Sequence, residues 1–283
     1  MMDYLYYNST CRDCADILNL EKEIEFPDNI AGRVLQRIYE QFDVANDLDP
    51  DLFYQTLKEI NEAVDAGLPS MDWGTANKAF VDALKYNNAV FAAFKTHRQQ
   101  NDLAAQLVGE NGEPKDFNTF RKDCAPILKD YNSVWLKTEH DTAVKSARTA
   151  ARFADFERDK DLFPNLKWIR SRALEPRFSH KLYYNSIRSM SDPWFKTHYP
   201  GCVWGCQCDI NNTDAPITHV GNNPVVAAAE TSEQGNVPGL DKNPYYTKSI
   251  FSQTHPYVTQ GYQPVDKLKK ILLPLVEKLL KQK

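Results

Sequence analysis

The sequence lacks long apolar runs and the short motifs that mark common enzyme classes. No stretch approaches the roughly 18 apolar residues that a membrane-spanning helix needs, so we expect no membrane span. The glycine-rich phosphate and dinucleotide loops, the G-x-S-x-G turn of hydrolases and the H-E-x-x-H zinc motif are missing. Carboxylates are plentiful, but no motif marks any of them as catalytic. We therefore predict no catalytic residues.

Cysteine is scarce, and charge of one sign is not in large excess. Six cysteines in 283 residues are too few for a disulfide scaffold, and no basic segment followed by an apolar core suggests export. The cysteines are therefore expected to be reduced thiols or metal ligands. A net charge of −4 argues against a protein built mainly to coat nucleic acid. The 42% hydrophobic and 25% charged content excludes wholesale disorder.

The charge is distributed unevenly along the chain. Residues 1–70 hold fifteen acidic residues against five basic ones. Residues 265–283 carry six lysines against Asp266 and Glu277. An acidic head and a basic tail indicate surfaces for different partners, although two solvated faces are the simpler interpretation.

Most of the first two-thirds shows helical periodicity. Apolar residues recur at helical spacing over residues 30–42, 52–67, 72–107 and 117–157, with Pro126 expected to kink or start part of the last stretch. Alanines along residues 143–154 form a narrow face that would let another helix approach closely, or that simply favours a packed helix. Residues 166–170 read as a strand, and helical periodicity is weak from there to residue 258. Residues 266–280 form an amphipathic helix that Pro274 is expected to interrupt.

These patterns predict an α+β fold. A mostly helical N-terminal two-thirds with long helices precedes a small β- and loop-rich domain and a C-terminal amphipathic helix. We expect an N-terminal arm with a C-x-x-C over residues 1–30, a helical domain over 31–165, a β-rich domain over 166–258 and a basic tail helix over 259–283.

The chemically densest stretch is residues 198–208. Cys206 and Cys208 are two apart, so on an extended strand both thiols point to one face and can share a metal ion. A disulfide between them would be strained. The candidates to complete a site are Cys202, His198, His180, His255 and the remote pair Cys11 and Cys14. Structural zinc would stabilise a β region with little core of its own; buried reduced thiols are the simpler alternative.

Several segments together resemble the phage Mu F-like head morphogenesis proteins, also called minor head or minor capsid proteins. The resemblance covers roughly residues 75–258 and is closest to versions in Bacteroidetes phages and prophages. It rests on Arg177 and His180, on Asp192-Pro-Trp194, on Trp204-Gly205-Cys206-Gln-Cys208 and on His255-Pro-Tyr. Upstream, Thr138 and Glu139 are similar to the Thr-Glu helix of that family.

The sequence departs from the family pattern at three places. The family usually has an acid and a further arginine before Arg177, where Ala173 and Glu175 stand here. Gln207 replaces an arginine between the two cysteines, and Cys202 with Val203 stands where Asn-Gly is usual. His180 and the cysteine pair remain, which favours a structural or metal role for this region over a charge-dependent one.

The resemblance implies a structural virion protein, made in the host cytoplasm and placed in the capsid interior or near the portal. Such a protein would assist head morphogenesis and DNA packaging or delivery. Its partners would be the portal or major capsid protein, with packaged double-stranded DNA contacted through the basic tail. One alternative is a metal-dependent enzyme or toxin of the nuclease or ADP-ribosyltransferase class. Another is a zinc-stabilised DNA-binding module, which the acidic total disfavours.

Overall fold

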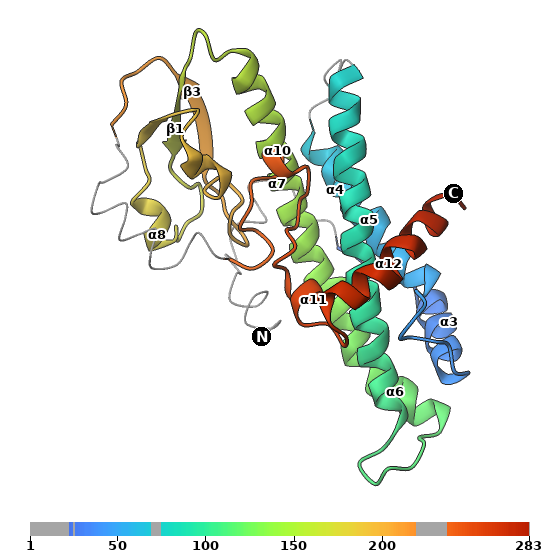
Figure 1. The fold of residues 1–283 in the computed structure, drawn as a ribbon. Helices are drawn as coiled ribbons and strands as arrows, with labels where there is room; N and C mark the ends of the chain where they lie inside the picture. The colour runs from blue at the N-terminus through green and yellow to red at the C-terminus, as the bar shows by residue number, and fades with distance from the viewer. Residues whose placement is uncertain (1–22, 25, 69–74, 219–236, 283) are drawn as a thin grey trace. The chain divides into compact units, whose positions relative to one another are not determined.

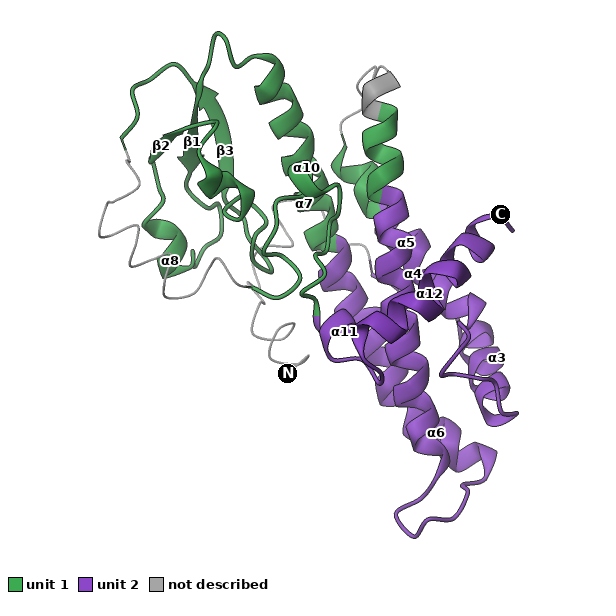
Figure 2. Cartoon of the chain, viewed as in Figure 1, with its two compact units in different colours: residues 1–21, 63–84, 141–255 green, residues 22–62, 85–140, 256–283 purple. Residues whose placement is uncertain are grey.

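The computed structural model describes residues 23–24, 26–68, 75–218 and 237–282 (Figure 1). The chain divides into two compact units, coloured separately in Figure 2. Unit 1 comprises residues 1–21, 63–84 and 141–255, and unit 2 comprises residues 22–62, 85–140 and 256–283. Three long helices, α4 (Pro50–Gly67), α5 (Thr75–Ala104) and α7 (Trp135–Arg158), contribute residues to both units.

The regular structure in the described part of unit 2 is helical apart from one isolated β-bridge between Val108 and Pro114. It contains α3 (Asp28–Tyr39), the first part of α4, most of α5, the short η1 (Ala105–Leu107), α6 (Phe117–Lys129), the π-helical turn η2 (Asp130–Val134), the start of α7, α11 (Pro256–Thr259) and α12 (Val265–Leu280). The side chain of Asp116 accepts hydrogen bonds from two backbone amides of α6 and caps its start. One apolar core joins α3, α4, α5 and α6 through Val34, Leu35, Ile38, Leu52, Leu103, Phe120 and Cys124.

A buried ion pair holds three segments of unit 2 together. Lys95 Nζ of α5 lies 2.5 Å from Glu139 Oε2 of α7, and both side chains are fully buried. The Tyr257 hydroxyl of α11 donates a hydrogen bond to Glu139 Oε1 at 3.0 Å. Burial lowers the pKa of Lys95, and the adjacent carboxylate opposes that shift. Each charge therefore depends on its partner, because neither reaches water.

In unit 1, the small-residue face of α7 receives another helix. A Cβ added to Gly67, the last residue of α4, would lie 2.4 Å from the Val144 carbonyl oxygen and 2.8 Å from Ala147 Cβ. The close approach predicted for the alanine face is therefore present, and α4 meets it with a glycine. Ala143, Ala147, Ala150 and Ala151 are all buried.

The only sheet among the described residues has three antiparallel strands in the order β2-β1-β3. The central strand β1 (Asn165–Ile169) pairs Leu166 with Arg188 of β2 (Ile187–Ser189). On its other edge β1 pairs Trp168 with Ile210 of β3 (Asp209–Thr213). The remaining regular elements of unit 1 are short: α8 (Phe178–Lys181), η3 (Pro193–Lys196) and α10 (Pro244–Thr247). A sheet this small needs support from packing against it.

The α+β fold class predicted from the sequence is confirmed: long helices come first, and the small sheet follows. The expectation that Pro274 interrupts the last helix is wrong, because α12 runs through it. Pro274 is exposed, so water can solvate the carbonyl that its missing N–H leaves without a partner. In the part of the chain that the structure describes, no helix combines the length and apolar content needed to cross a bilayer.

We expect Glu139→Gln to lower the free energy of unfolding by about 3–5 kcal/mol, because it leaves the Lys95 ammonium buried without a countercharge. The matched control is Glu62→Gln, which breaks a solvent-exposed pair with Lys58 and should cost less than about 1 kcal/mol. Chemical denaturation measures both. Equal costs for the two variants would contradict the role given to the buried pair.

Candidate metal centre

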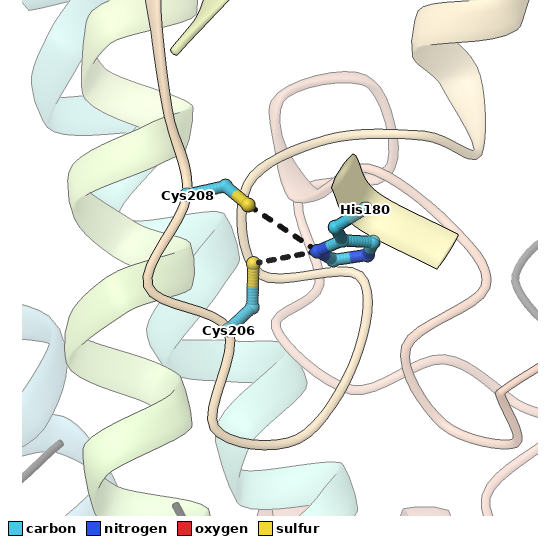
Figure 3. Close-up of side chains that lie close together, drawn as sticks. All are labelled: His180, Cys206 and Cys208. Carbon is cyan, nitrogen blue, oxygen red and sulfur yellow. Dashed lines mark hydrogen bonds between the residues drawn. The ribbon is translucent and has the colours of Figure 1, made fainter. Parts of the chain in front are cut away.

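Three metal-ligating side chains converge in unit 1. His180 comes from α8, and Cys206 and Cys208 come from the irregular segment directly before β3 (Figure 3). His180 Nδ1 lies 3.7 Å from Cys206 Sγ and 3.3 Å from Cys208 Sγ. One ligand atom from each residue falls within 4.8 Å of the other two. The two thiols therefore face one nitrogen of the same imidazole, although the segment that carries them is irregular and not the extended strand on which the sequence argument rested.

The separations fit a shared metal ion. In a tetrahedral site the metal lies about 2.3 Å from sulfur and about 2.1 Å from nitrogen, which places sulfur and nitrogen about 3.6 Å apart. The two sulfur–nitrogen distances of 3.3 and 3.7 Å bracket that value. The trio could therefore hold a metal ion with little rearrangement of the side chains.

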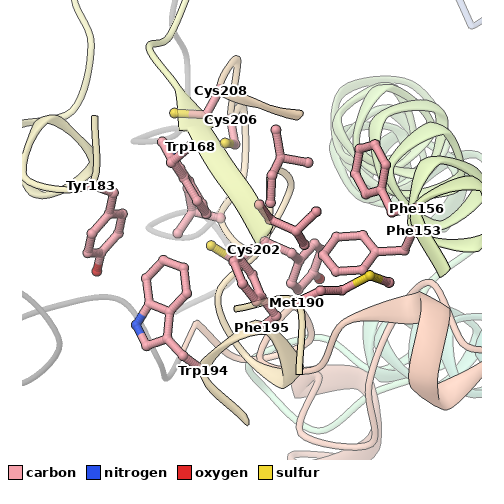
Figure 4. Close-up of a cluster of buried hydrophobic side chains, with 14 residues drawn as sticks. Phe153, Phe156, Trp168, Tyr183, Met190, Trp194, Phe195, Cys202, Cys206 and Cys208 are labelled. Atoms are coloured by element: carbon pink, nitrogen blue, oxygen red, sulfur yellow. The ribbon is translucent and has the colours of Figure 1, made fainter. Parts of the chain in front are cut away.

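The trio is buried in the aromatic core of unit 1. His180, Cys206 and Cys208 are 2%, 6% and 1% exposed. Trp168 of β1 packs its ring edge against His180, with ring centroids 5.7 Å apart. Figure 4 shows the two thiols in a cluster of bulky side chains drawn from α7, β1 and the loops after it. Ligands at this depth are screened from large substrates.

The charges around the thiols favour ionised sulfur. A hydrogen bond from Cys208 holds the pKa of Cys206 well below its usual range; burial opposes this shift, and the positive charges of His180 and Lys145 add to it. The same hydrogen bond, together with burial, raises the pKa of Cys208. Burial lowers the pKa of His180, but the Cys206 charge and hydrogen bonds with Cys202 and Cys206 raise it to about 10. Without metal, these neighbours therefore favour ionisation of Cys206 and protonation of His180.

The other candidate ligands within the described residues lie outside this group. Cys202 Sγ lies 3.9 Å from His180 Nε2, on the opposite ring nitrogen. His255 packs against Trp204 and Phe251. His198 stacks on Trp194, with ring centroids 4.5 Å apart. Cys11 and Cys14 lie outside the described residues. All four described cysteines, including Cys124 of unit 2, are free thiols.

Two hydrogen-bonded contacts join motif residues along residues 177–208. The Arg177 guanidinium donates a hydrogen bond to the Trp204 carbonyl oxygen at 3.0 Å. Asp192 accepts from the Trp194 amide at 2.9 Å and from Arg188 Nη1 at 2.9 Å. Gly205 has a φ of +69°, so the turn that leads into Cys206 needs a residue free to adopt left-handed backbone.

The last motif residue, His255, packs against Trp204 at the turn that leads into Cys206. The Trp204 ring lies edge-on to His255, with centroids 6.0 Å apart, and stacks on Phe251 at 5.9 Å. A Cβ on Gly239 would come within 2.4 Å of His255 Cδ2, so this histidine fills the space that the glycine leaves. His255 is thus a packing residue in the structure.

The two helix-motif residues lie in the other unit. Thr138 Oγ1 donates to the Val134 carbonyl oxygen at 3.3 Å. Glu139 forms the buried pair with Lys95 described above. Neither belongs to the metal-ligating trio.

Sequence reasoning missed one charged residue near the trio. Lys145 of α7 is 7% exposed, burial lowers its pKa, and the charges of Asp209, Cys206 and Cys208 oppose that shift. It lies in the alanine-rich part of α7, where a lysine reads as an exposed residue between packing positions. The presence of a lysine within this row of small residues is the sequence feature that could have indicated a buried charge.

Comparisons with protein-family models, with curated proteins and with solved structures returned no match to this chain.

We expect the purified protein to bind about one divalent metal ion that prefers thiolate ligands, measured by mass spectrometry of metal content. His180→Ala, Cys206→Ser and Cys208→Ser should each lose most of the metal. Cys124→Ser, a buried thiol in unit 2, is the matched control and should keep it, as should Cys202→Ser. Equal metal content in all five variants would contradict the assignment of the trio.

Proposed function

We propose that this chain is a structural minor head protein of a phage or prophage and that zinc at His180, Cys206 and Cys208 stabilises its cysteine-containing unit. It would act in the virion, near the portal, in head morphogenesis and DNA packaging or delivery. One observation carries the proposal. Elements that resemble the Mu F-like family, separated along residues 177–255, meet in the structure: Arg177 bonds to Trp204, Trp204 packs on His255, and Trp194 shares a buried core with Cys206 and Cys208.

Zinc is the metal that the donor set favours. Two thiolates and an imidazole suit zinc better than the oxygen-preferring ions, and no redox change is needed for a structural role. The described residues provide three ligands, and a structural zinc site usually has four. A water molecule, or a residue outside the described part, would complete the coordination.

The burial of the trio favours a structural protein over an enzyme. A catalytic metal needs a coordination position that substrate can reach. Here each ligand is at most 6% exposed. This supports the structural proposal over the nuclease and ADP-ribosyltransferase alternatives.

The C-terminal helix supports DNA as one partner. Each helical residue advances about 100° around the axis, so Lys267, Lys270, Lys278 and Lys281 fall within an arc of about 80°. All four are exposed, and the opposite face of α12 is buried through Leu268, Leu272, Val276 and Leu279. No ion pair within the described residues joins these lysines to an acidic side chain. This lysine stripe, defined by the four residues, suits a phosphate backbone.

The function is tested on particles purified after induction of the prophage that encodes the chain. Peptides of this protein should co-purify with the portal and major capsid proteins, and deletion of its gene should reduce the yield of DNA-filled heads. Complementation with Cys124→Ser should restore the yield, and complementation with Cys206→Ser should not. Particles that contain portal protein but not this chain would contradict the proposal.

The DNA contact is tested separately on the purified protein. Four phosphate contacts predict a slope of about −3.6 for the logarithm of the binding constant against the logarithm of salt concentration. Replacement of the lysine stripe by glutamine should abolish binding to a double-stranded oligonucleotide. Lys122→Gln with Lys129→Gln, two exposed lysines of α6, is the matched control and should leave it unchanged. Binding that survives loss of the stripe would exclude α12 as the contact.

A further inference from the structure

One loop of unit 1 presents large apolar side chains to solvent. Residues 170–178, called here the arginine loop, connect β1 to α8. Leu174 is 74% exposed and Phe178 is 76% exposed. Both forgo the free energy that burial would provide, and neighbouring exposed apolar side chains are typical of interaction sites.

The backbone of the arginine loop is held by the segment that carries the cysteines. The Arg172 amide donates to the Gln207 carbonyl oxygen at 3.3 Å, and the Arg177 guanidinium donates to the Trp204 carbonyl oxygen. Ser171 and Ser179, near its two ends, are buried. A partner would therefore meet side chains on a backbone that is already ordered, which lowers the entropy cost of association.

The net positive charge of the arginine loop favours an acidic partner. Arg170, Arg172 and Arg177 are exposed, and Glu175 is its only acidic residue; Arg172 makes one long ion pair, 4.0 Å, with Asp209 outside the loop. Arginine beside large apolar side chains is the composition found at the centres of protein interfaces.

Unit 2 carries a surface of the complementary kind. Residues 40–47, called here the acidic turn, hold Glu40, Asp43 and Asp47 and no basic residue. Phe42 and Val44 within it are only partly buried. No ion pair joins its three acids to a lysine or arginine within the described part of the chain.

The backbone of the acidic turn is fixed by contacts with side chains of α5. Gln100 Nε2 donates to the Val44 carbonyl oxygen at 2.6 Å, and His97 Nε2 lies 3.1 Å from the Ala45 carbonyl oxygen. Both partners come from α5. Within the described residues, the carboxylates of Glu40, Asp43 and Asp47 accept hydrogen bonds only from neutral groups of neighbouring residues, so their negative charges are not neutralised there.

We propose that the arginine loop of one copy docks onto the acidic turn of a second copy of this chain. Opposite charge, apolar side chains on both surfaces and two ordered backbones support this pairing. Every copy carries both surfaces, and they differ, so the contact is head-to-tail and produces rings or open chains. The inference goes beyond the proposed function and holds independently of it.

The first test is sedimentation velocity of the full-length, metal-loaded protein over a range of concentrations. Self-association should appear at low salt and weaken by at least about tenfold when salt rises from about 50 to about 500 mM, because screening weakens contacts between exposed charges.

Two double variants of the arginine loop should remain monomeric in the same experiment: Arg170→Glu with Arg172→Glu, and separately Leu174→Ser with Phe178→Ser. Arg158→Glu and Leu162→Ser are matched controls, since Arg158 is 60% and Leu162 74% exposed outside the loop. Both should associate normally.

The second test distinguishes a head-to-tail contact from any other. A loop variant (Arg170→Glu with Arg172→Glu) keeps a natural acidic turn, and a turn variant (Glu40→Gln with Asp43→Asn) keeps a natural arginine loop without creating a basic surface that the altered loop could bind. Each should be monomeric alone, and a mixture should form a dimer that contains one of each and grows no further. Circular dichroism checks that both variants fold.

Three results would overturn the proposal: a monomer at every concentration, loop variants that associate like the natural chain, or a mixture that stays monomeric. A chain that remains monomeric but binds another acidic protein would assign the arginine loop to a different partner. None of these outcomes alters the particle test of the proposed function.

Discussion

A buried group of two thiols and one imidazole is the constraint on which unit 1 depends. Without metal, any charge on His180, Cys206 or Cys208 lies buried beside an aromatic core, away from water. Burial of ions is costly unless strong partners compensate. A divalent metal would replace the protons of this group and join three side chains at once, so that the same burial becomes a source of stability.

The rest of unit 1 is organised around that group. Its sheet has strands of five, three and five residues, too small to be stable alone. The chain between and after the strands is fixed by side-chain contacts: Arg177 on the Trp204 carbonyl, Asp192 at the start of η3, and His255 against Trp204. The arginine loop is attached to the same segment, so occupancy of the centre would also govern the surface proposed for docking.

Much of the fold was predictable because helices leave a local signal. The periodic stretches at residues 30–42 and 117–157 correspond to α3 and to α6, η2 and α7. The pairing of Cys206 with Cys208 also followed from local spacing. The choice of His180 over His255, and the position of Cys202 at the other ring nitrogen, depend on tertiary contacts between distant segments. The Lys95–Glu139 pair, 44 residues apart, was hidden for the same reason.

The central claim is that zinc bound by His180, Cys206 and Cys208 stabilises unit 1. X-ray absorption at the zinc edge of the purified protein tests it most directly. The account predicts two sulfur ligands at about 2.3 Å and the remaining ligands nitrogen or oxygen at about 2.0–2.1 Å. A shell of three or four sulfurs would bring in Cys202 or the pair Cys11 and Cys14 and contradict the assigned ligand set. Protein that holds no zinc and keeps a folded unit 1 would contradict the claim itself.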